Sequence, residues 1–239
     1  MLANYVVIDL EMTGLSSFRD KIIEIGAVKV RDGAVSDVFQ ELVNPNVQIE
    51  EKIVELTGIT QDMVADKPYV GTILHDFLHF AGENPIIGHN LKFDYSFLMQ
   101  AGYDNNCLAC TNRKWYGIDT LKLARKFLDK DCSKTLEALG KQFGIKDDNH
   151  HRALNDAMVT RELYEILCRQ YEKEGECFEP EELHYKPKKD RKPSVRELRY
   201  AEQLMERLGV KSEVDIYQMM QSELSRYANR LEIELRKRL

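Results

Sequence analysis

A short apolar run near the beginning of the chain, Tyr-Val-Val-Ile-Asp-Leu-Glu at residues 5–11, constrains the fold most strongly because two carboxylates interrupt it. Its β-branched residues, followed by a Thr-Gly break, predict a buried central strand that reaches its end here. Asp9 and Glu11 then emerge on the same face and repel each other unless they are protonated or neutralised by a cation. By itself the pattern fits a metal site and a pair of hydrated acids equally well.

A third acid follows another short apolar strand. Residues 85–98 run from that strand through a turn at His89 and Asn90 into a predicted helix, which carries Asp94. The core-facing stripe of this helix would consist of Phe93, Phe97 and Leu98. Asp94 is then left on a flank near the strand ends, where it can meet the first pair. The alternative is a helix-start acid favoured by the macrodipole, with His89 and Asn90 as turn residues.

The last cluster places His151 five residues before Asp156, at the start of a long helical pattern. Five residues correspond to about 140° around an ideal helix, so the two side chains cannot share a helix face. We therefore expect His151 just before the helix, on a lip from which an imidazole can reach a substrate held at Asp156. The alternative is an ordinary surface histidine, which is also what we expect of His150.

The three clusters together resemble the DEDDh exonucleases, the superfamily that includes the proofreading epsilon subunit of bacterial replicative DNA polymerase. The similarity lies in residues 9–15 for the first motif, 89–94 for the second and 151–156 for the third, with further epsilon-like segments at 21–28 and 56–60. It covers roughly the first 170 residues, one domain of ordinary size. Met12 differs from the threonine usual in the epsilon-like group and is more like the oligoribonucleases of the same superfamily. Because the second motif is of the epsilon type, we favour DNA over RNA.

The resemblance implies an α/β fold, a ribonuclease H-like mixed five-stranded sheet flanked by helices. Strands are expected at residues 5–11, 22–30, 34–43, 86–87 and 116–119, with a hairpin at the Asp32-Gly33 step. Helices are expected at 69–80, 91–101, 120–128, 134–143 and after residue 152.

A ligand set made only of oxygen atoms favours hard cations such as Mg²⁺ or Mn²⁺. We therefore expect two divalent cations, held by Asp9, Glu11, Asp94 and Asp156. The resemblance implies that Asp9 bridges both, that Glu11 and Asp156 complete the site of the attacking water, and that Asp94 acts from the other side. His151 would be the general base, since imidazole has an unperturbed pKa of about 6.5 and can accept a proton near neutral pH.

The resemblance also implies attack at a free 3′ end with release of nucleoside 5′-monophosphates. The expected substrate contacts are Thr13, Gly14, Leu15, Leu56, His89, Asn90 and Phe93. The apolar members of this set can equally belong to the core. Single-stranded DNA is the favoured substrate and a DNA polymerase is a possible partner. The rival hypothesis is a module bound to nucleic acid or polymerase that retains the fold without turnover.

Composition favours a cytoplasmic enzyme. The chain has 239 residues, of which 43% are hydrophobic and 31% charged. It shows neither a basic leader nor an apolar run near the ~20 residues that a membrane span requires, so we expect no membrane association. Five cysteines indicate reduced thiols. The close pair Cys107 and Cys110, even with Cys132, lacks the fourth ligand of a zinc site.

The predicted domains are an exonuclease domain at 1–178, a basic linker at 179–193 and a helical appendage at 194–239. From residue 180 onward the formal charge is +3, against −9 before it. The basic linker can hold a phosphate backbone or simply be hydrated. In the appendage we expect a helix at 194–209, a second beginning near residue 212 or 213, and a third at 224–235.

Overall fold

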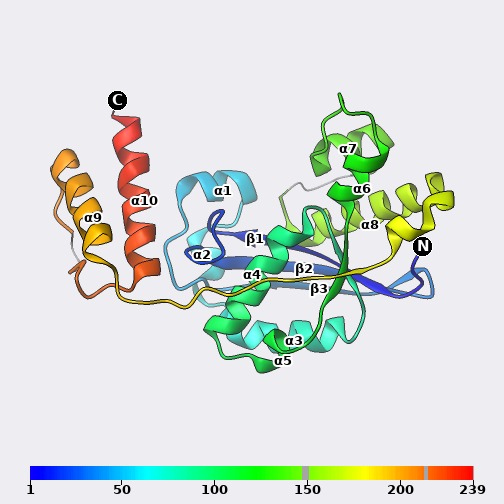
Figure 1. Cartoon of the computed structure of the whole chain (residues 1–239), viewed down its shortest axis with the longest axis horizontal. Coiled ribbons are helices and arrows are strands. Elements are labelled where there is room, and N and C mark those ends of the chain that lie inside the picture. Colours follow the sequence, from blue (N-terminus) through cyan, green and yellow to red (C-terminus); the bar gives the residue numbers. More distant parts are fainter. Residues whose placement is uncertain (147–150, 213–214, 239) are drawn as a thin grey trace. The chain divides into compact units, whose positions relative to one another are not determined.

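The structure is a computed structural model that describes residues 1–146, 151–212 and 215–238 (Figure 1). Its contacts divide the chain into two compact units. The first unit consists of Met1–Leu15 and Lys21–Lys186, and the second of Ser16–Asp20 and Pro187–Leu239. His150, predicted to be a surface residue, lies outside the described residues.

A mixed sheet of six strands forms the centre of the first unit, in the order β3-β2-β1-β4-β5-β6. The strands are β1 (Tyr5–Met12), β2 (Ile22–Arg31), β3 (Ala34–Leu42), β4 (Ile86–Gly88), β5 (Tyr116–Asp119) and β6 (Glu181–Glu182). Strand β2 is antiparallel to both of its neighbours, β1 and β3, while β4 and β5 run parallel to β1, and β6 is antiparallel to β5. Asp32 and Gly33 both have positive φ, as the predicted hairpin requires.

The expected count of five strands is wrong by one. Strand β6 contains only two residues, both glutamates, so neither alternation nor β-propensity could indicate it. It is held by pairing with β5 and by ion pairs of Lys122 with Glu181 (2.8 Å) and of Lys114 with Glu182 (3.6 Å).

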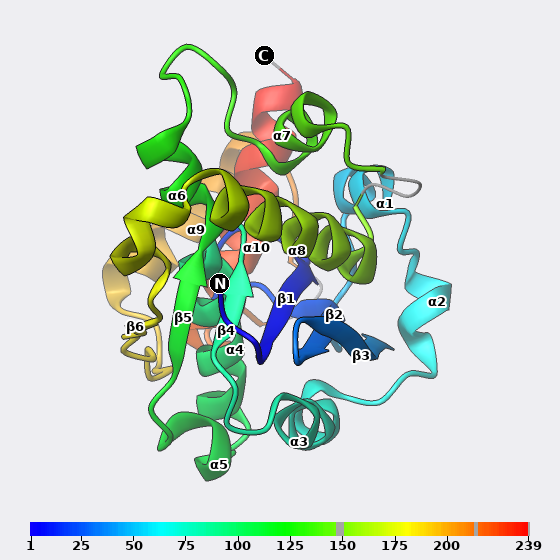
Figure 2. The ribbon, with the colours of Figure 1, turned by 90° about the vertical axis from the view of Figure 1, so that its right-hand side faces the viewer.

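Helices cover both faces of the sheet. They are α1 (Glu51–Thr57), α2 (Gln61–Ala65), α3 (Val70–Ala81), α4 (Leu91–Asp104), α5 (Leu108–Thr111), α6 (Thr120–Phe127), α7 (Leu136–Phe143), α8 (Ala153–Gln170) and a 3₁₀ helix at Glu172–Phe178. One core cluster joins the sheet to α3, α4 and α5, and another joins it to α6, α7 and α8. Figure 2 shows α3 and α8 on opposite faces. No helix within the described ranges is both long and apolar enough to cross a membrane.

Alternation along β1 decides which way its carboxylates point. Tyr5 and Val7 pack in the cluster that contains α8, whereas Val6, Ile8 and Leu10 pack in the other. The same alternation carries the next odd positions, residues 9 and 11, toward the α8 side. The strand therefore supplies two acids to the end of the sheet over which α8 begins.

The first turn of α8 packs directly on β2. A Cβ atom added to Gly26 would lie 2.1 Å from the carbonyl carbon of Ala153 and from the amide nitrogen of Leu154. Only a residue without a side chain permits this approach. Because Gly26 is paired with Asp9 across the strands, the same contact sets the distance of α8 from the acids of β1.

The end of the first unit and the start of the predicted linker overlap. The backbone amide of Leu183 donates to the carbonyl of Trp115 (2.8 Å), and the Tyr185 hydroxyl donates to Oε1 of Gln100 (3.1 Å). The segment expected as a linker, residues 179–193, is thus divided between the two units. That residues 1–178 and 194–239 form separate domains stays a prediction.

The second unit is built on α9 (Val195–Leu208) and α10 (Gln221–Lys237). Ser194 and Glu197 form a capping box at the start of α9, and Gly209 ends it with φ of 67°. The buried apolar residues that pack the second unit together are Ala201, Leu204, Leu208, Ile216, Leu224, Ala228 and Leu231. The Arg238 guanidinium donates to the Leu208 carbonyl (3.0 Å), so the carboxyl ends of the two helices lie together.

The second helix expected in this unit is wrong for the residues described. Residues 216–219 form turns and a bend, and 213–214 lie outside the described residues. The chain uses this stretch to return from the end of α9 to its beginning, where the Gln221 amide donates to the Arg191 carbonyl (2.7 Å). The two helices are therefore parallel, which requires a long connection.

The contact at Gly26 generates a stability prediction. Gly26→Ala should lower the free energy of unfolding by about 3 kcal/mol or more, because its methyl group meets backbone that cannot rotate away. The matched control is Gly175→Ala, whose added Cβ has nothing within 4 Å. Chemical denaturation of both variants measures the difference. Equal stability of the two variants would show that α8 is not seated on β2 as described.

Candidate active site

Carboxylates from three separate elements meet beside the end of β1. Strand pairing sets Glu11 opposite Glu24, and Asp9 opposite Gly26. Asp94, in the first turn of α4, accepts a hydrogen bond from the Leu10 amide (3.1 Å). The fold thus brings Asp94 from the opposite helical layer to the strand that carries the first pair.

The third element is α8, which contributes Asp156 from its first turn. One ligand atom each of Glu11, His151 and Asp156 lie within 4.8 Å of one another. Both carboxylates are largely buried, while His151 is exposed. This is the geometry expected for a site that holds a cation on its acids and presents an imidazole at its rim.

His151 lies outside the helix, as the five-residue offset from Asp156 predicts. Helix α8 begins at Ala153 with Arg152 as its N-cap residue, and His151 adopts a left-handed backbone conformation with φ of 60°. That conformation is uncommon for a residue with a side chain. The chain enters α8 directly after this residue, and His151 stays exposed at the surface.

The gathered acids carry an electrostatic cost. Burial raises the pKa of Asp9 well above its usual range, and the nearby charges of Asp94 and Asp156 raise it further. Burial likewise raises the pKa of Glu11 to about 8, with Asp156 adding to the rise and Arg152 opposing it. The pKa of Asp94 is raised to about 7, chiefly by burial, although backbone amides favour its charged form. Each acid thus resists ionisation in the absence of a cation.

One further buried acid in this region is already neutralised. Glu24 is fully buried and accepts hydrogen bonds from the Arg152 guanidinium at 2.7 and 3.1 Å. Its carboxylate also accepts from the Ala153 amide (3.0 Å) and from Nε2 of Gln40 (2.9 Å). It therefore caps the amino end of α8, where the N-cap residue supplies no side-chain bond. Its interactions fix α8 and the residue after His151 against β2.

The donor chemistry fits divalent cations. The acids that lack the compensation given to Glu24 offer oxygen ligands, which suit Mg²⁺ and Mn²⁺. Binding of such a cation would favour the ionised forms whose pKa values burial raises. Among the described residues, the grouping whose ligand atoms lie within 4.8 Å of one another contains Glu11 and Asp156 with His151, whereas Asp9 and Asp94 lie outside that grouping.

The cysteines provide no comparable site. All five have free thiols, and Cys107 and Cys110 are buried. Burial raises the pKa of the Cys110 thiol to about 12, which disfavours the thiolate that zinc needs. Among the described residues, the grouping of His, Cys, Asp and Glu suited to a metal contains no cysteine.

The segment that follows the first acids leaves the strand in a fixed turn. The Thr13 amide donates to the Lys21 carbonyl (2.8 Å), and the Lys21 amide donates to the Thr13 hydroxyl (2.9 Å). Thr13 is buried and Gly14 half-buried, but Leu15 is 84% exposed. Leu15 is therefore not a core residue and is available for contact.

The two other apolar residues predicted at the substrate differ from each other. Leu56, in α1, is 51% exposed, which excludes the core alternative for it. Phe93 is partly buried and packs edge-on against Phe97, with 5.3 Å between ring centroids. Its contacts fit the core alternative.

His89 and Asn90 form the turn between β4 and α4. His89 Nε2 donates to the Lys134 carbonyl (2.8 Å), and Nδ1 lies 2.9 Å from the Thr120 hydroxyl. Burial lowers the pKa of His89, although the bond to the carbonyl opposes this. Asn90 has φ of 65°, and its amide donates to Asp119 Oδ1 (3.0 Å). These contacts fit the structural alternative for His89 and leave the exposed Asn90 side chain at the helix start.

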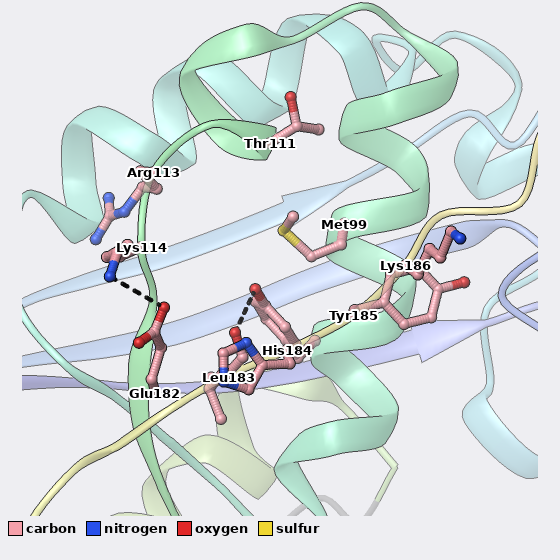
Figure 3. Close-up of a pocket in the computed structure, with 10 residues that line it drawn as sticks. Met99, Thr111, Arg113, Lys114, Glu182, Leu183, His184, Tyr185 and Lys186 are labelled. Atoms are coloured by element: carbon pink, nitrogen blue, oxygen red, sulfur yellow. Dashed lines mark hydrogen bonds and ion pairs between the residues drawn. The ribbon is translucent and has the colours of Figure 1, made fainter.

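A separate hollow of about 390 Å³ lies where residues 182–186 pass alongside α4 (Figure 3). The Tyr95 hydroxyl donates to the Leu183 carbonyl (3.3 Å) across its floor. The other lining residues are Met99, Thr111, Arg113, Lys114, Glu182, His184, Tyr185 and Lys186. None of the predicted site residues lines this hollow, which is distinct from the cluster of acids.

Glu24, Arg152 and Asp119 take part in the site's hydrogen bonds but were not among the residues predicted from the sequence. Glu24 interrupts an apolar strand and Arg152 follows His151 directly, so both lie in segments that carry the resemblance. A charged residue within a buried strand requires a partner, and this requirement could have indicated Glu24 from the sequence. Asp119 caps α6 through the Leu121 amide (3.0 Å) besides accepting from Asn90. No spacing pattern in the sequence links it to the second motif.

The chain matches known nucleases over most of its first unit. The RNase_T family model, described as an exonuclease, matches residues 6–164. The PolC-type DNA polymerase III of Clostridium perfringens is 40% identical over 183 residues, which are 76% of this chain and 12% of that relative. The chain therefore spans only a small part of the length of such relatives.

Solved structures share the fold. Exonuclease X in complex with 5′ overhanging duplex DNA is 28% identical with a TM-score of 0.57, covering 70% of this chain and 93% of that one. Escherichia coli exonuclease I in complex with a dT13 oligonucleotide is 19% identical with a TM-score of 0.63, covering 73% and 43%. A zinc-bound form of the same exonuclease with single-stranded DNA is 18% identical with a TM-score of 0.61, covering 72% and 42%.

The raised pKa values predict a pH-dependent stability. Between about pH 4 and 8 the folded protein holds protons on Glu11 and Asp94 that the unfolded chain releases, so the free energy of unfolding falls as pH rises. Thermal unfolding in EDTA should show the Tm falling over this range. Mg²⁺ at pH 8 should restore it, because the cation stabilises the ionised acids.

Two variants test the origin of this effect. Asp94→Asn should flatten the EDTA profile and reduce the Mg²⁺ shift, because it removes one buried charge. Glu55→Gln, at an exposed acid of α1, should leave both unchanged. An unaltered profile in Asp94→Asn would exclude the acid cluster as its source.

Proposed function

The chain belongs to the RNase_T exonuclease family, which confirms its resemblance to the DEDDh 3′–5′ exonucleases, and on this premise we propose its reaction. It removes nucleoside 5′-monophosphates from the 3′ end of a nucleic acid strand, DNA in preference to RNA, by metal-dependent hydrolysis. The observation that carries this proposal is the convergence of buried acids from β1, α4 and α8 on one site.

Asp9, Glu11, Asp94 and Asp156 are the proposed ligands of two divalent cations, Mg²⁺ or Mn²⁺. When bound there, such ions would supply Lewis-acid stabilisation to the attacking and leaving oxygens of an in-line displacement. Asp9 is central in this assignment because the charges of Asp94, Asp156 and Glu11 all act on it. Because one structural neighbour was solved with zinc bound, the choice of metal is tested by comparing activity with Mg²⁺, Mn²⁺ and Zn²⁺.

His151 is the proposed general base. Its position within 4.8 Å of ligand atoms of Glu11 and Asp156 lets the imidazole accept the proton of the attacking water. A bond forms between that water oxygen and phosphorus, and the bond from phosphorus to the 3′ oxygen of the preceding nucleotide breaks. The shortened strand keeps that oxygen as its new 3′ hydroxyl, and the released nucleotide carries the 5′ phosphate.

The terminal nucleotide is proposed to contact the Thr13–Leu15 segment and α1. The exposed side chains of Leu15 and Leu56 supply apolar surface for a base, and Gly14 leaves room for close approach of the sugar. Asn90 is a polar contact at the start of α4. Phe93 and His89 are proposed to support this surface from beneath, as their packing and hydrogen bonds suggest.

Two alternatives use the same fold. Met12 favours an RNA-directed exonuclease, because that position resembles the oligoribonucleases. A non-catalytic module bound to nucleic acid or to a polymerase is favoured by the PolC-type relatives, in which such a segment is a small part of the chain. The complete set of acids and His151 argues against the second alternative. A replicative role beside a polymerase is part of the proposal, supported by the same relatives.

Release of mononucleotides tests the chemistry. With Mg²⁺ or Mn²⁺ the protein should shorten a 3′-ended oligonucleotide, and Asp9→Asn should abolish both this activity and the metal-induced rise in Tm. His151→Ala should lower the rate by roughly 10² to 10⁴ while it keeps the metal-induced rise. A His151→Ala variant with full activity would exclude the proposed base, and an inactive wild-type protein with normal metal binding would favour the non-catalytic module.

Substrate choice requires matched strands. Single-stranded DNA should be degraded faster than RNA of the same sequence and length, and mismatched duplex ends faster than paired ends. Met12→Thr serves as the matched variant, since it restores the residue usual in the epsilon-like group. Faster degradation of RNA by the wild-type protein would establish the exoribonuclease alternative.

A further inference from the structure

We propose that the exposed side of α9 binds the sugar-phosphate backbone of the substrate strand. This surface, the α9 face, consists of Val195, Arg196, Arg199, Tyr200 and Gln203. The inference rests on the proposed function for the identity of the strand. It assigns a role to the second unit, which lies outside the segment matched by the family model.

Charge separates the two units. Summed over the sequence, the residues of the first unit carry a formal charge of −10 and those of the second +4. A strongly acidic unit repels a polyanion, so a nuclease of this composition gains from a cationic surface beyond its metal site. The second unit is the part of the chain that has a cationic surplus.

The surplus is not consumed within the unit. Two acids of the second unit near the start of α9, Asp190 and Glu197, already accept hydrogen bonds from neighbouring residues. Asp190 accepts from the Ser222 amide (3.1 Å), and Glu197 accepts from the Ser194 amide (2.7 Å) and the Arg191 guanidinium (3.0 Å). Arg196 and Arg199 are exposed and make no ion pair or hydrogen bond with residues that the structure describes. Their guanidinium groups remain available to phosphate oxygens.

The residues of the α9 face form one stripe. Spacings of one, three, one and three residues keep them on the side of the helix away from its buried residues, Ala201, Leu204 and Leu208. With Glu197 they line an open hollow of about 780 Å³. The stripe is thus a continuous surface that the packing of α9 on α10 leaves uncovered.

The uncharged members of the stripe suit a nucleic acid strand. The Tyr200 hydroxyl donates to Oε1 of Glu232 (2.7 Å), which fixes the side chain while the residue stays 46% exposed. A fixed aromatic ring beside two arginines offers a base a stacking surface next to phosphate contacts. Val195, at 65% exposure, adds apolar area, and Gln203 adds donors and acceptors.

The second unit also contains the turn that follows the first acid motif. The Arg226 guanidinium, on α10, donates to the Arg19 carbonyl at 2.6 and 2.9 Å. Residues Ser16–Asp20 are joined by a peptide bond to Leu15, the exposed residue of the proposed nucleotide contact. A strand held on α9 is therefore bound by the same unit that includes the turn leading out of that contact.

Strand binding and salt dependence test the proposal. Full-length protein and the variant Arg196→Gln/Arg199→Gln are titrated with a 30-nucleotide single strand in EDTA, which prevents cleavage, at several salt concentrations. The variant should bind about ten-fold more weakly near 0.1 M salt, and the magnitude of its slope of log affinity against log salt should fall by about 1.4, since each phosphate contact of a single strand contributes about 0.7. The matched control, Arg207→Gln/Lys237→Gln, removes two exposed cations at the other end of the helix pair and should change neither value.

Hydrolysis of a p-nitrophenyl ester of thymidine 5′-monophosphate, a substrate with no sugar-phosphate backbone beyond a single nucleotide, should be equal in all three proteins. Unchanged strand affinity in Arg196→Gln/Arg199→Gln overturns the proposal, as does an equal loss in the control, which would indicate non-specific charge. Unchanged affinity with self-association that the variant abolishes would assign the face to a second copy. Failure of ester hydrolysis with intact strand binding counts against the proposed function and leaves the α9 face supported.

Discussion

The placement of α8 on β2 is the constraint on which the site depends. Glu24 holds it by bonds to the Arg152 guanidinium and to the Ala153 amide, and Gly26 allows the backbone to approach. Since β2 is paired with β1 in a fixed register, this contact also sets Asp156 and His151 relative to Asp9 and Glu11. A single ion pair and a single glycine thereby align two motifs that are about 140 residues apart in the sequence.

In their ionised forms, the acids at this site oppose folding. Buried carboxylates close to one another are costly in the ionised form, and burial is the largest cause of the raised pKa values of Asp9, Glu11 and Asp94. Glu24 shows the contrasting solution, in which an arginine and backbone donors satisfy the charge within the protein. This difference distinguishes Glu24, whose charge is satisfied within the protein, from the acids that are proposed to bind a cation.

The two units divide the charge between them in a way that matches the proposed reaction. The acidic first unit contains the acids proposed to hold cations, and the second unit presents Arg196 and Arg199 on α9, which have no partner among the residues that the structure describes. Parallel packing of α9 and α10 leaves this side open, because the connection between them returns to the start of the pair. Hydrolysis and strand binding are thus assigned to different surfaces, which separate variants can test.

Several features were beyond sequence reasoning for identifiable reasons. The two-residue strand β6 carries no periodic signal and exists only because β5 offers an edge. The helix expected to begin near residue 212 or 213 is not formed by the described residues. Because α9 and α10 are parallel, the chain needs this stretch to return from the end of α9 to the start of α10. His89 matches the second motif, yet both of its ring nitrogens are engaged by Lys134 and Thr120, residues that are distant in the sequence.

The sequence alone determined five of the six strands, most helices and the family, because alternation, β-branched residues and three ordered motifs are local properties of the chain. It also predicted that His151 precedes α8, from helix geometry alone. Only the tertiary structure decided which charges are neutralised, since Glu24 meets Arg152 through packing of distant elements. It likewise decided that the turn Ser16–Asp20 belongs with the C-terminal helices, because that association depends on contacts across some 200 residues of sequence.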